Sequence, residues 1–302
     1  MSFRHSPSEH IQQIRNDLRD RYSSGFPILK ELLQNADDAG AEIPGSGSEA
    51  SQCVIVLCPN GLPEGKHALL KSAGLCLIND GDFTSGDANS INSYGLSNRG
   101  GQAGTAGKFG LGLKSIFHWA EAFFYFSSQT FKSDGEEQSH PFDLQNPWFN
   151  RYTKKGLHRD WDAKWMETSD PTGTQKADFN VFKRFAGAVV GETRWFGLWI
   201  PFRTEEQTKD VPPIEKRFPK PDFHDLFGED WLERVVEALP LLRRIRTVRF
   251  GVWRDGGFVE ECCATLAAPS SRMSFGTDAQ VPPLFQTPTR QRDRESVREP
   301  RR

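Results

Sequence analysis

The sequence lacks the long apolar segments that membrane-spanning and secreted proteins carry. No stretch of its 302 residues reaches the ~18 consecutive apolar residues that a membrane-spanning helix needs. The first residues, MSFRHSPSEHIQQIRND, contain no apolar segment of the signal-peptide type. We therefore expect no signal peptide, no membrane-spanning helix and no membrane partner.

Cysteine is scarce, and its positions follow no metal-binding or disulfide pattern. The five cysteines are Cys53, Cys58, Cys76, Cys262 and Cys263. No Cys-x-x-Cys pair indicates a zinc site. Three of them lie in apolar runs typical of strands, where a free cysteine acts as a small hydrophobic side chain. This usage is typical of a reducing compartment, so we expect a cytoplasmic protein.

The chain also lacks a strong charge of either sign. Its formal net charge is −2 at pH 7, which gives no whole-protein attraction to nucleic acid or to an anionic membrane. The hydrophobic fraction of 36% is low for a compact enzyme, but it is adequate for a core with long polar loops. The length fits one large or two smaller domains.

The most informative stretch is 28–40, read ILKELLQNADDAG, which the spacing of apolar residues predicts to be a helix. Its apolar stripe is Leu29, Leu32, Leu33 and Ala36. Glu31 and Asn35 stand four residues apart and share a face, with Asp38 one turn further on. Glu31 has the chemistry of a general base that polarises an attacking water. Asn35 offers a carbonyl oxygen, a hard ligand suited to Mg²⁺. The alternative is a solvated polar stripe on an amphipathic helix.

A second stretch, 107–115, reads GKFGLGLKS and places three glycines before the helical run 113–122. Glycines at such a place allow positive φ and close approach of the backbone to a ligand. The start of the following helix presents free N–H groups to an anion. We interpret this stretch as a phosphate cradle, although its spacing differs from the P-loop pattern GxxxxGK[ST]. The alternative is an ordinary tight loop before a helix.

Together the two stretches resemble the ATPase fold shared by heat-shock chaperones of the ninety-kilodalton class, gyrase B subunits, mismatch-repair ATPases and histidine kinases, the GHKL superfamily. The first motif of that superfamily, E-x-x-x-N-x-x-D-A, matches at Glu31, Asn35, Asp38 and Ala39. The last motif, G-x-F-G-x-G-x-x-S, matches at Gly107, Phe109, Gly110, Gly112 and Ser115. Several ordered motifs at the spacing of one family are more specific than any one of them alone.

Between these motifs the superfamily has an acidic, adenine-reading D-x-G motif, and here 75–84 reads LCLINDGDFT. Asn79, Asp80 and Gly81, followed by a Phe-Thr pair, are most similar to the sacsin-type branch, whose middle motif is degenerate. The resemblance implies that either Asp80 or Asn79 binds the exocyclic amine of adenine. Charge favours Asp80, and the register stays open. A plain turn is the alternative for these residues.

The resemblance implies ATP and Mg²⁺ as cofactors. The implied function is slow ATP hydrolysis coupled to lid closure and conformational change, chaperone-like or within a larger multidomain protein. Glu31 would position water and Asn35 would hold Mg²⁺. The other expected nucleotide-binding residues are Asp38, Asn79, Asp80, Gly81, Gly107, Lys108, Phe109, Gly110, Leu111, Gly112 and Ser115. A non-hydrolysing nucleotide-binding scaffold is the alternative, because Trp195 and Phe196 replace a Gly-Thr pair whose threonine helps to read adenine in the family.

The implied fold class is α+β, a two-layer α/β sandwich of the Bergerat type with helices on one face of a mixed sheet and a C-terminal helix–strand extension. We expect strands at 53–58, 75–78, 123–127, 195–203 and 245–253. The expected organisation is a helical segment 1–22, an ATP-binding domain 23–203 with a lid at 84–107 and an insertion of little regular structure at 132–180, a linker 204–222, the extension 223–268 and a tail 269–302.

The expected partners other than ATP are few. Members of the superfamily often dimerise when the lid closes, so a homodimer stays open, and clients or further domains are not identified. The tail has no apolar period and is expected to be disordered. Its last sixteen residues hold six arginines against three acidic residues, and such a tail can contact nucleic acid or acidic partners. Nucleic-acid binding is not expected elsewhere in the chain.

Overall fold

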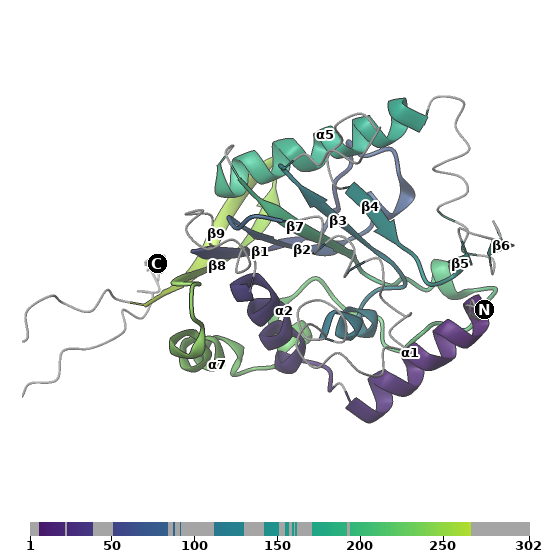
Figure 1. Ribbon diagram of the computed structural model, residues 1–302, viewed down its shortest axis with the longest axis horizontal. Coiled ribbons are helices and arrows are strands. Elements are labelled where there is room, and N and C mark those ends of the chain that lie inside the picture. Colours follow the sequence, from purple (N-terminus) through teal and green to yellow (C-terminus); the bar gives the residue numbers. More distant parts are fainter. Residues whose placement is uncertain are drawn as a thin grey trace, which may run out of the picture.

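A seven-stranded mixed sheet lies at the centre of the computed structural model, in the order β4-β3-β7-β2-β1-β8-β9 (Figure 1). The structure describes residues 6–21, 23–38, 51–83, 87, 91, 112–129, 142–150, 155–156, 159, 161, 171–191 and 194–266. The strands of the sheet are β1 (Gln52–Cys58), β2 (Gly74–Asn79), β3 (Phe123–Ser127), β4 (Phe142–Gln145), β7 (Phe196–Pro201), β8 (Thr247–Arg254) and β9 (Gly257–Thr265). A separate two-stranded ribbon is formed by β5 (Phe149–Asn150) and β6 (Lys155–Gly156).

The central strands are continuous apolar runs, because side chains on both faces of the sheet are covered. Strand β1 pairs antiparallel with β2 and parallel with β8, while β7 joins β2 to β3 in antiparallel fashion. Each strand predicted from the sequence is present, with its ends shifted by a few residues at most. Strand β9, which the sequence did not indicate, forms a hairpin with β8.

Most of the helices cover one face of the sheet, below it in Figure 1. They are α1 (Pro7–Arg21), α2 (Phe26–Asp38), the 3₁₀ helix η2 (Gly112–His118), α6 (Phe223–Phe227), α7 (Trp231–Ala238) and the 3₁₀ helix η4 (Leu239–Leu241). Alternate residues of the central strands, such as Ile55 and Leu77, pack with the apolar stripe of α2 in one buried cluster. The expected α+β class, with a mixed sheet and a layer of helices packed on this face, is confirmed.

The opposite face carries α5 (Pro171–Val190) and the short 3₁₀ helix η1 (Ala68–Leu70). The expectation of little regular structure at 132–180 needs correction here, because β4 lies within that segment and α5 begins in it. Phe179, Phe182 and Phe185 recur at helical spacing and pack on the sheet. The scattered charges of the region obscured this period in the sequence.

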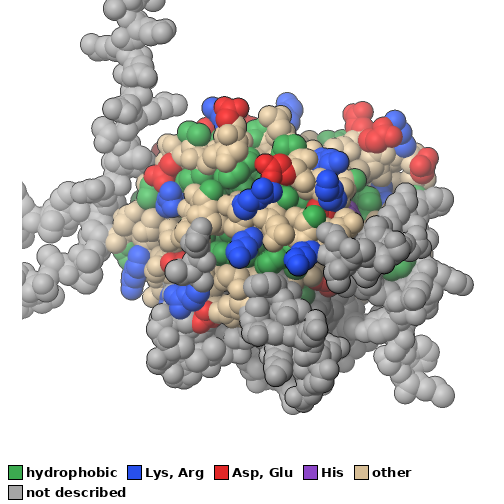
Figure 2. All heavy atoms as spheres, turned by 90° about the horizontal axis from the view of Figure 1, so that it is seen from above, with side chains coloured by type: hydrophobic (Ala, Val, Ile, Leu, Met, Phe, Trp, Pro, Cys, Tyr) green, Lys and Arg blue, Asp and Glu red, His purple; other side chains and the backbone are tan. Residues whose placement is uncertain are grey.

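Seen from above, this face shows Lys and Arg side chains interspersed with acidic and apolar ones (Figure 2). Several of the charges form ion pairs across elements, such as Arg184 with Glu64 and Arg249 with Glu260. The described part of this face therefore carries charges of both signs.

The chain after residue 203 belongs to the same folded unit. Residues 204–222, expected to be a linker, contain the 3₁₀ helix η3 (Glu206–Thr208) and bury Ile214 in the core. The expected helix–strand extension supplies β8 and β9 to the central sheet. No helix in the described part of the chain is long and apolar enough to cross a membrane.

Candidate functional site

Helix α2 presents Glu31, Asn35 and Asp38 from an element that is rooted in the core. Asn35 lies about two turns after the fully buried Ile28 and therefore on the same side of the helix, and it is itself only 8% exposed. Its side-chain amide nitrogen has no hydrogen-bond partner among the described residues. Glu31 and Asp38 are half-buried. The predicted polar face is thus partly enclosed and is not an ordinary solvated stripe.

The end of α2 is fixed by Asp37, which the sequence analysis did not single out. Its carboxylate accepts the backbone N–H groups of Arg243, Arg244 and Ile245 at 2.8, 2.7 and 2.8 Å. A buried carboxylate is stable when backbone donors satisfy it in this way. These bonds join α2 to the segment that enters β8, so the position of Asn35 is coupled to the central sheet.

Gly112, at the start of η2, lies directly against the carboxylate of Glu31. A methyl group at Gly112 would overlap the Glu31 Oε2 atom, so the close approach itself requires glycine. The Ser115 hydroxyl donates to the Gly112 carbonyl at 2.7 Å and closes the first turn of η2. The first and last motifs, about 70 residues apart in the sequence, therefore meet here in space.

The remaining residues of the glycine-rich motif lie outside the described residues. They are Gly107, Lys108, Phe109, Gly110 and Leu111. Of the expected lid at 84–107, the structure describes Asp87 and Ile91, both of which are buried. The roles expected for this part of the chain stay predictions.

Asp80 is held by the start of β1. Its Oδ1 atom accepts the N–H groups of Ser51 and Gln52 at 2.7 and 3.0 Å, and its Oδ2 atom accepts the Ser51 hydroxyl at 2.6 Å. Both carboxylate oxygens thus have partners within the protein. Asp80 was the preferred adenine-binding residue because of its charge. Its carboxylate instead links the end of β2 to the start of β1.

Asn79, by contrast, has a free donor. It is 1% exposed, and its Oδ1 atom accepts the N–H of Gly81 at 3.0 Å. Its Nδ2 atom has no partner among the described residues. Side chains alternate along β2, so Asn79 points to the same face as Leu77, the face that α2 and η2 cover.

Phe196 stands directly across from Asn79 in the antiparallel pair of β2 and β7. Its ring stacks on that of Phe83, with centroids 4.4 Å apart and an angle of 8° between the planes. This stacked pair occupies the place where the sequence analysis noted a departure from the Gly-Thr of the family.

A cavity of about 390 Å³ opens beside α2. Glu31, Asn35 and Asp38 line one side of it, and Leu241, Leu242 and Arg243 line the other. Carboxylate and amide oxygens are ligands that Mg²⁺ accepts, usually together with water and substrate phosphate. Among the described residues no cluster of three or more His, Cys, Asp or Glu side chains forms a complete metal cage.

Comparison with known proteins identifies the family of this chain. The profile of the family described as "Sacsin domain" matches residues 8–261. The chain belongs to the sacsin-domain family. Human sacsin is 33% identical over 102 residues, which cover 32% of this chain and 2% of sacsin. The match thus spans a very small part of that relative. The resemblance inferred from the motifs is confirmed, and the chain carries an ATPase-type domain of the GHKL class.

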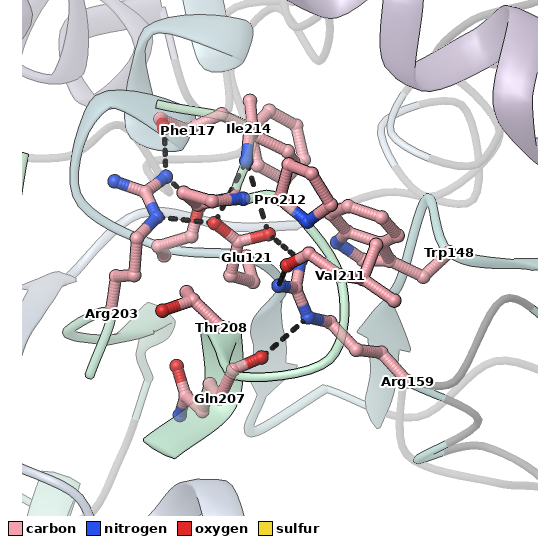
Figure 3. Close-up of polar contacts among 12 residues, drawn as sticks. Phe117, Glu121, Trp148, Arg159, Arg203, Gln207, Thr208, Val211, Pro212 and Ile214 are labelled. Carbon is pink, nitrogen blue, oxygen red and sulfur yellow. Dashed lines mark hydrogen bonds and ion pairs between the residues drawn. The ribbon is translucent and has the colours of Figure 1, made fainter. Parts of the chain in front are cut away.

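The sacsin domain also contains a buried charged cluster, centred on Glu121, that sequence reasoning missed (Figure 3). Arg203, fully buried, donates its Nε–H to Glu121. Its other donors go to backbone carbonyl oxygens of Phe117, His118, Ala120 and Arg217 at distances of 2.6–3.0 Å. Carbonyl groups at the end of a helix lack hydrogen-bond donors within the helix. Arg203 provides these donors at the end of η2.

The second cation of this charged cluster is Arg159. It pairs with Glu121, donates to the carbonyl oxygens of Gln207 and Val211 at 2.8 and 2.7 Å, and lies 3.9 Å from the centre of the Trp148 ring. Burial lowers the pKa of Arg159 from its ordinary value. The cluster thereby fixes residues 204–217 against the end of η2. Arg203 ends the sequence Pro-Phe-Arg at 201–203. Its role cannot be recognised there, because its partners lie far away in the sequence.

Helix α1 of the sacsin domain is attached to η2 through a buried ion pair. The ammonium of Lys114 lies 2.7 Å from Asp17, and their side chains are 2% and 12% exposed. Arg15 donates to the carbonyl oxygens of Pro212 and Pro213 at 2.9 and 2.8 Å. Helix α1 is therefore part of the same layer as η2.

Proposed function

We propose that this sacsin domain binds ATP and hydrolyses it slowly in a Mg²⁺-dependent reaction. The observation that carries the proposal is the contact between Glu31 and Gly112. It brings a carboxylate of α2 to the last glycine of a motif whose chemistry suits phosphate. A core helix has no structural need for a carboxylate at that place.

Glu31 has the properties of a general base for an attacking water. It is half-buried, and among the described residues it forms no ion pair with a Lys or Arg. A carboxylate without a cationic partner can polarise an attacking water. Its place against Gly112 puts that capacity next to the expected phosphate position.

Asn35 fits a role at the metal and phosphate end of the site. Its amide N–H, buried without a described partner, needs an acceptor such as a phosphate oxygen. Its carbonyl oxygen suits Mg²⁺, and Asp38 lines the same cavity with a further oxygen. When bound, Mg²⁺ would neutralise charge on the transferred phosphoryl group.

For recognition of the adenine base of the nucleotide, the contacts support Asn79 over Asp80. The carboxylate of Asp80 is engaged by Ser51 and Gln52, whereas the amide of Asn79 keeps a free donor. Gly81 turns the chain directly after it and donates its N–H to Asn79. We therefore assign base recognition to Asn79.

The same fold with ATP binding and no turnover is the second candidate function. Phe196 favours it, because an apolar ring lies where the family has a hydroxyl group, and the stack with Phe83 leaves that position without a polar contact to the base. The proposal also includes three features that membership of the family implies. They are closure of the 84–107 stretch on nucleotide binding, a chaperone-like role in a larger cytoplasmic protein, and dimerisation.

The deciding experiment measures ATP binding and phosphate release for the wild type and for Glu31→Ala. We expect Glu31→Ala to bind Mg²⁺-ATP in calorimetric titration but to release phosphate at least about 100-fold more slowly, the range that a general base contributes. Glu233→Ala, an exposed glutamate on α7, is the control and should leave both unchanged. ATP binding without phosphate release in the wild type would support the second candidate function, a nucleotide-binding scaffold. Absence of binding would refute the proposal.

A further inference from the structure

A second cavity lies on the face of the sheet that α5 covers, opposite α2 (Figure 1). It is bounded by the loop 60–64 after β1, by one side of α5 and by the turn between β8 and β9. Its volume is about 340 Å³, near the lower end of the range typical of ligand pockets. It shares no residue with the cavity beside α2. The proposed nucleotide site therefore does not account for it.

One wall of the second cavity is apolar and ends in an aromatic ring. Leu62 of the loop and Val181 and Phe185 of α5 line it, each at most 9% exposed. Trp253 of β8 is partly buried beside Phe185, and the centroids of the two rings are 4.5 Å apart. Such a wall suits the methylene groups of a long side chain whose polar head stays at the mouth of the cavity.

The rim of the second cavity carries two arginines and two acidic residues. Arg184 is paired with Glu64. Arg254 lies 3.7 Å from Glu261, an acidic residue outside the rim. Asp255 forms no ion pair and no side-chain hydrogen bond among the described residues. With the two pairs counted, the rim therefore keeps one negative charge without a partner.

Three groups around the cavity have a binding capacity that the fold leaves unused. They are the carboxylate of Asp255, the ring of Trp253 and the amide of Asn60. Among the described residues, no cation lies over the Trp253 ring, and the Asn60 side chain makes no hydrogen bond. A carboxylate, an indole face and an amide oxygen all attract a cation that carries N–H donors.

Arginine meets these requirements better than lysine. Its guanidinium group is planar, stacks on an aromatic ring and binds a carboxylate through two parallel N–H groups. The domain already contains this arrangement, because Arg159 lies 3.9 Å from the centre of the Trp148 ring while it pairs with Glu121. An indole and an acceptor carboxylate recur at the second cavity, where another molecule would supply the arginine.

We propose that this cavity binds an arginine side chain on an exposed segment of a partner protein. The apolar wall holds its methylene groups, Trp253 stacks on its guanidinium, and Asp255 pairs with it. A free amino acid fits less well, because it also carries a carboxylate and both arginines of the rim are already paired with acidic residues.

The test titrates the full chain with an acetylated and amidated pentapeptide, Gly-Ser-Arg-Ser-Gly. Nuclear magnetic resonance follows the Trp253 indole signal, which is assigned with Trp253→Phe. This signal should shift with a dissociation constant of about 1 mM or lower. The lysine peptide should bind about tenfold more weakly, because an ammonium cannot stack or bind in two places. The peptide with citrulline, which has the shape of arginine without its charge, should give no shift.

Asp255→Asn should weaken binding of the arginine peptide by about tenfold, since it removes one charge-assisted pair. Asp255 has a φ of 51°, a conformation that asparagine also adopts, so the variant should keep the turn. Glu233→Gln, which removes an exposed carboxylate on α7, is the control and should leave binding unchanged.

Equal shifts with the arginine and citrulline peptides would overturn the proposal, even if a variant does not fold. Unchanged affinity in a folded Asp255→Asn variant would do the same. A shift that appears only after the six arginines of 287–302 are replaced with glutamine would make the chain's own tail the occupant and overturn the assignment to a partner. Tighter binding of free L-arginine than of the peptide would overturn it too. None of these measurements involves a nucleotide, so this inference and the proposed function are tested separately.

Discussion

At the scale of single residues, the site depends on what glycine and arginine allow and other side chains do not. Gly112 permits the carboxylate of Glu31 to touch the backbone, and Arg203 has enough donors to serve a carboxylate and several carbonyl oxygens at once. Both are places where a conservative substitution changes the geometry.

Gly112→Ala should lower phosphate release by at least about tenfold while the protein stays folded. The added methyl group overlaps the Glu31 carboxylate, and a displacement of about 1 Å in a catalytic group costs roughly that much or more. Gly257→Ala is the control, since a methyl group there meets nothing closer than 3.8 Å. Steady-state phosphate release and circular dichroism of both variants make the measurement. Equal rates in the two variants would refute the role of the contact.

Arg203→Lys should destabilise the fold by about 3 kcal/mol, measured by urea denaturation. Lysine has fewer donors and cannot match the fork of Arg203, so buried carbonyl oxygens at the end of η2 lose their partners. Arg184→Lys changes an exposed pair with Glu64, where both side chains are about two-thirds exposed. It should shift the free energy of unfolding by less than ~1 kcal/mol. Similar losses in both variants would contradict the assignment.

At the scale of elements, hydrogen bonds to His67 and Asp178 hold η1 and the turn before it. His67 caps η1 by accepting the Leu69 N–H at 3.1 Å. Asp178 of α5 accepts the N–H groups of Lys66 and His67 at 2.5 and 3.2 Å. Burial lowers the pKa of His67 to about 4, even though a bond to the Trp161 backbone raises it.

This lowered pKa predicts a stability change in mild acid. The unfolded chain binds a proton on His67 below an ordinary pKa of about 6.5, while the folded chain resists protonation until about pH 4. The stabilisation is therefore complete above about pH 6.5 and is lost as the pH falls toward 4. Between pH 7 and 5 the loss should be on the order of 2 kcal/mol.

Urea denaturation at pH 7 and pH 5 tests this expectation. His67→Gln should reduce the loss, whereas His224→Gln, an exposed histidine near Glu229, should leave it unchanged. Equal pH dependence in the wild type and His67→Gln would show that another group is responsible.

The elements also show what the sequence can and cannot reveal. The apolar runs of β1 and β2 and the stripe of α2 are local patterns, so their positions and types are predictable. Asp37, Glu121 and Arg159 act through partners 38 to more than 200 residues away, and no local pattern records such contacts. Asp80 shows the same limit. Its charge made it the natural choice for a ligand contact, but its carboxylate binds Ser51, a partner 29 residues distant.

At the scale of the whole molecule, the C-terminal third completes the fold. Strand β8 lies beside β1, and α6 and α7 cover the core next to α2. Trp231 and Phe250, in T-shaped contact at 4.5 Å, join that helical layer to the sheet. In the described residues, the segments expected as a linker and an extension contribute to the same core and the same sheet as residues 23–203.

A chain ending at residue 266 should therefore fold, and a chain ending at residue 222 should not. The shorter chain loses β8, so β1 would become an exposed edge strand over an uncovered core. Thermal melting of the 1–266 chain should give a Tm within about 3 °C of the full chain. The 1–222 chain should show no cooperative transition. A cooperative transition in the 1–222 chain would show that this part folds without β8 and would contradict the prediction.

The parallel pairing of β1 with β8 also bears on how the protein is made. Cys53 and Val248 are partners in this pair. During synthesis, β1 can therefore pair with β8 only after about 195 further residues have been made. At ribosomal speeds of about 5–20 residues per second, that wait is roughly 10–40 s. During this time one long edge of an apolar strand has no partner. The nascent chain is thus most vulnerable to aggregation before its last strands leave the ribosome, and slower synthesis would lengthen that exposure.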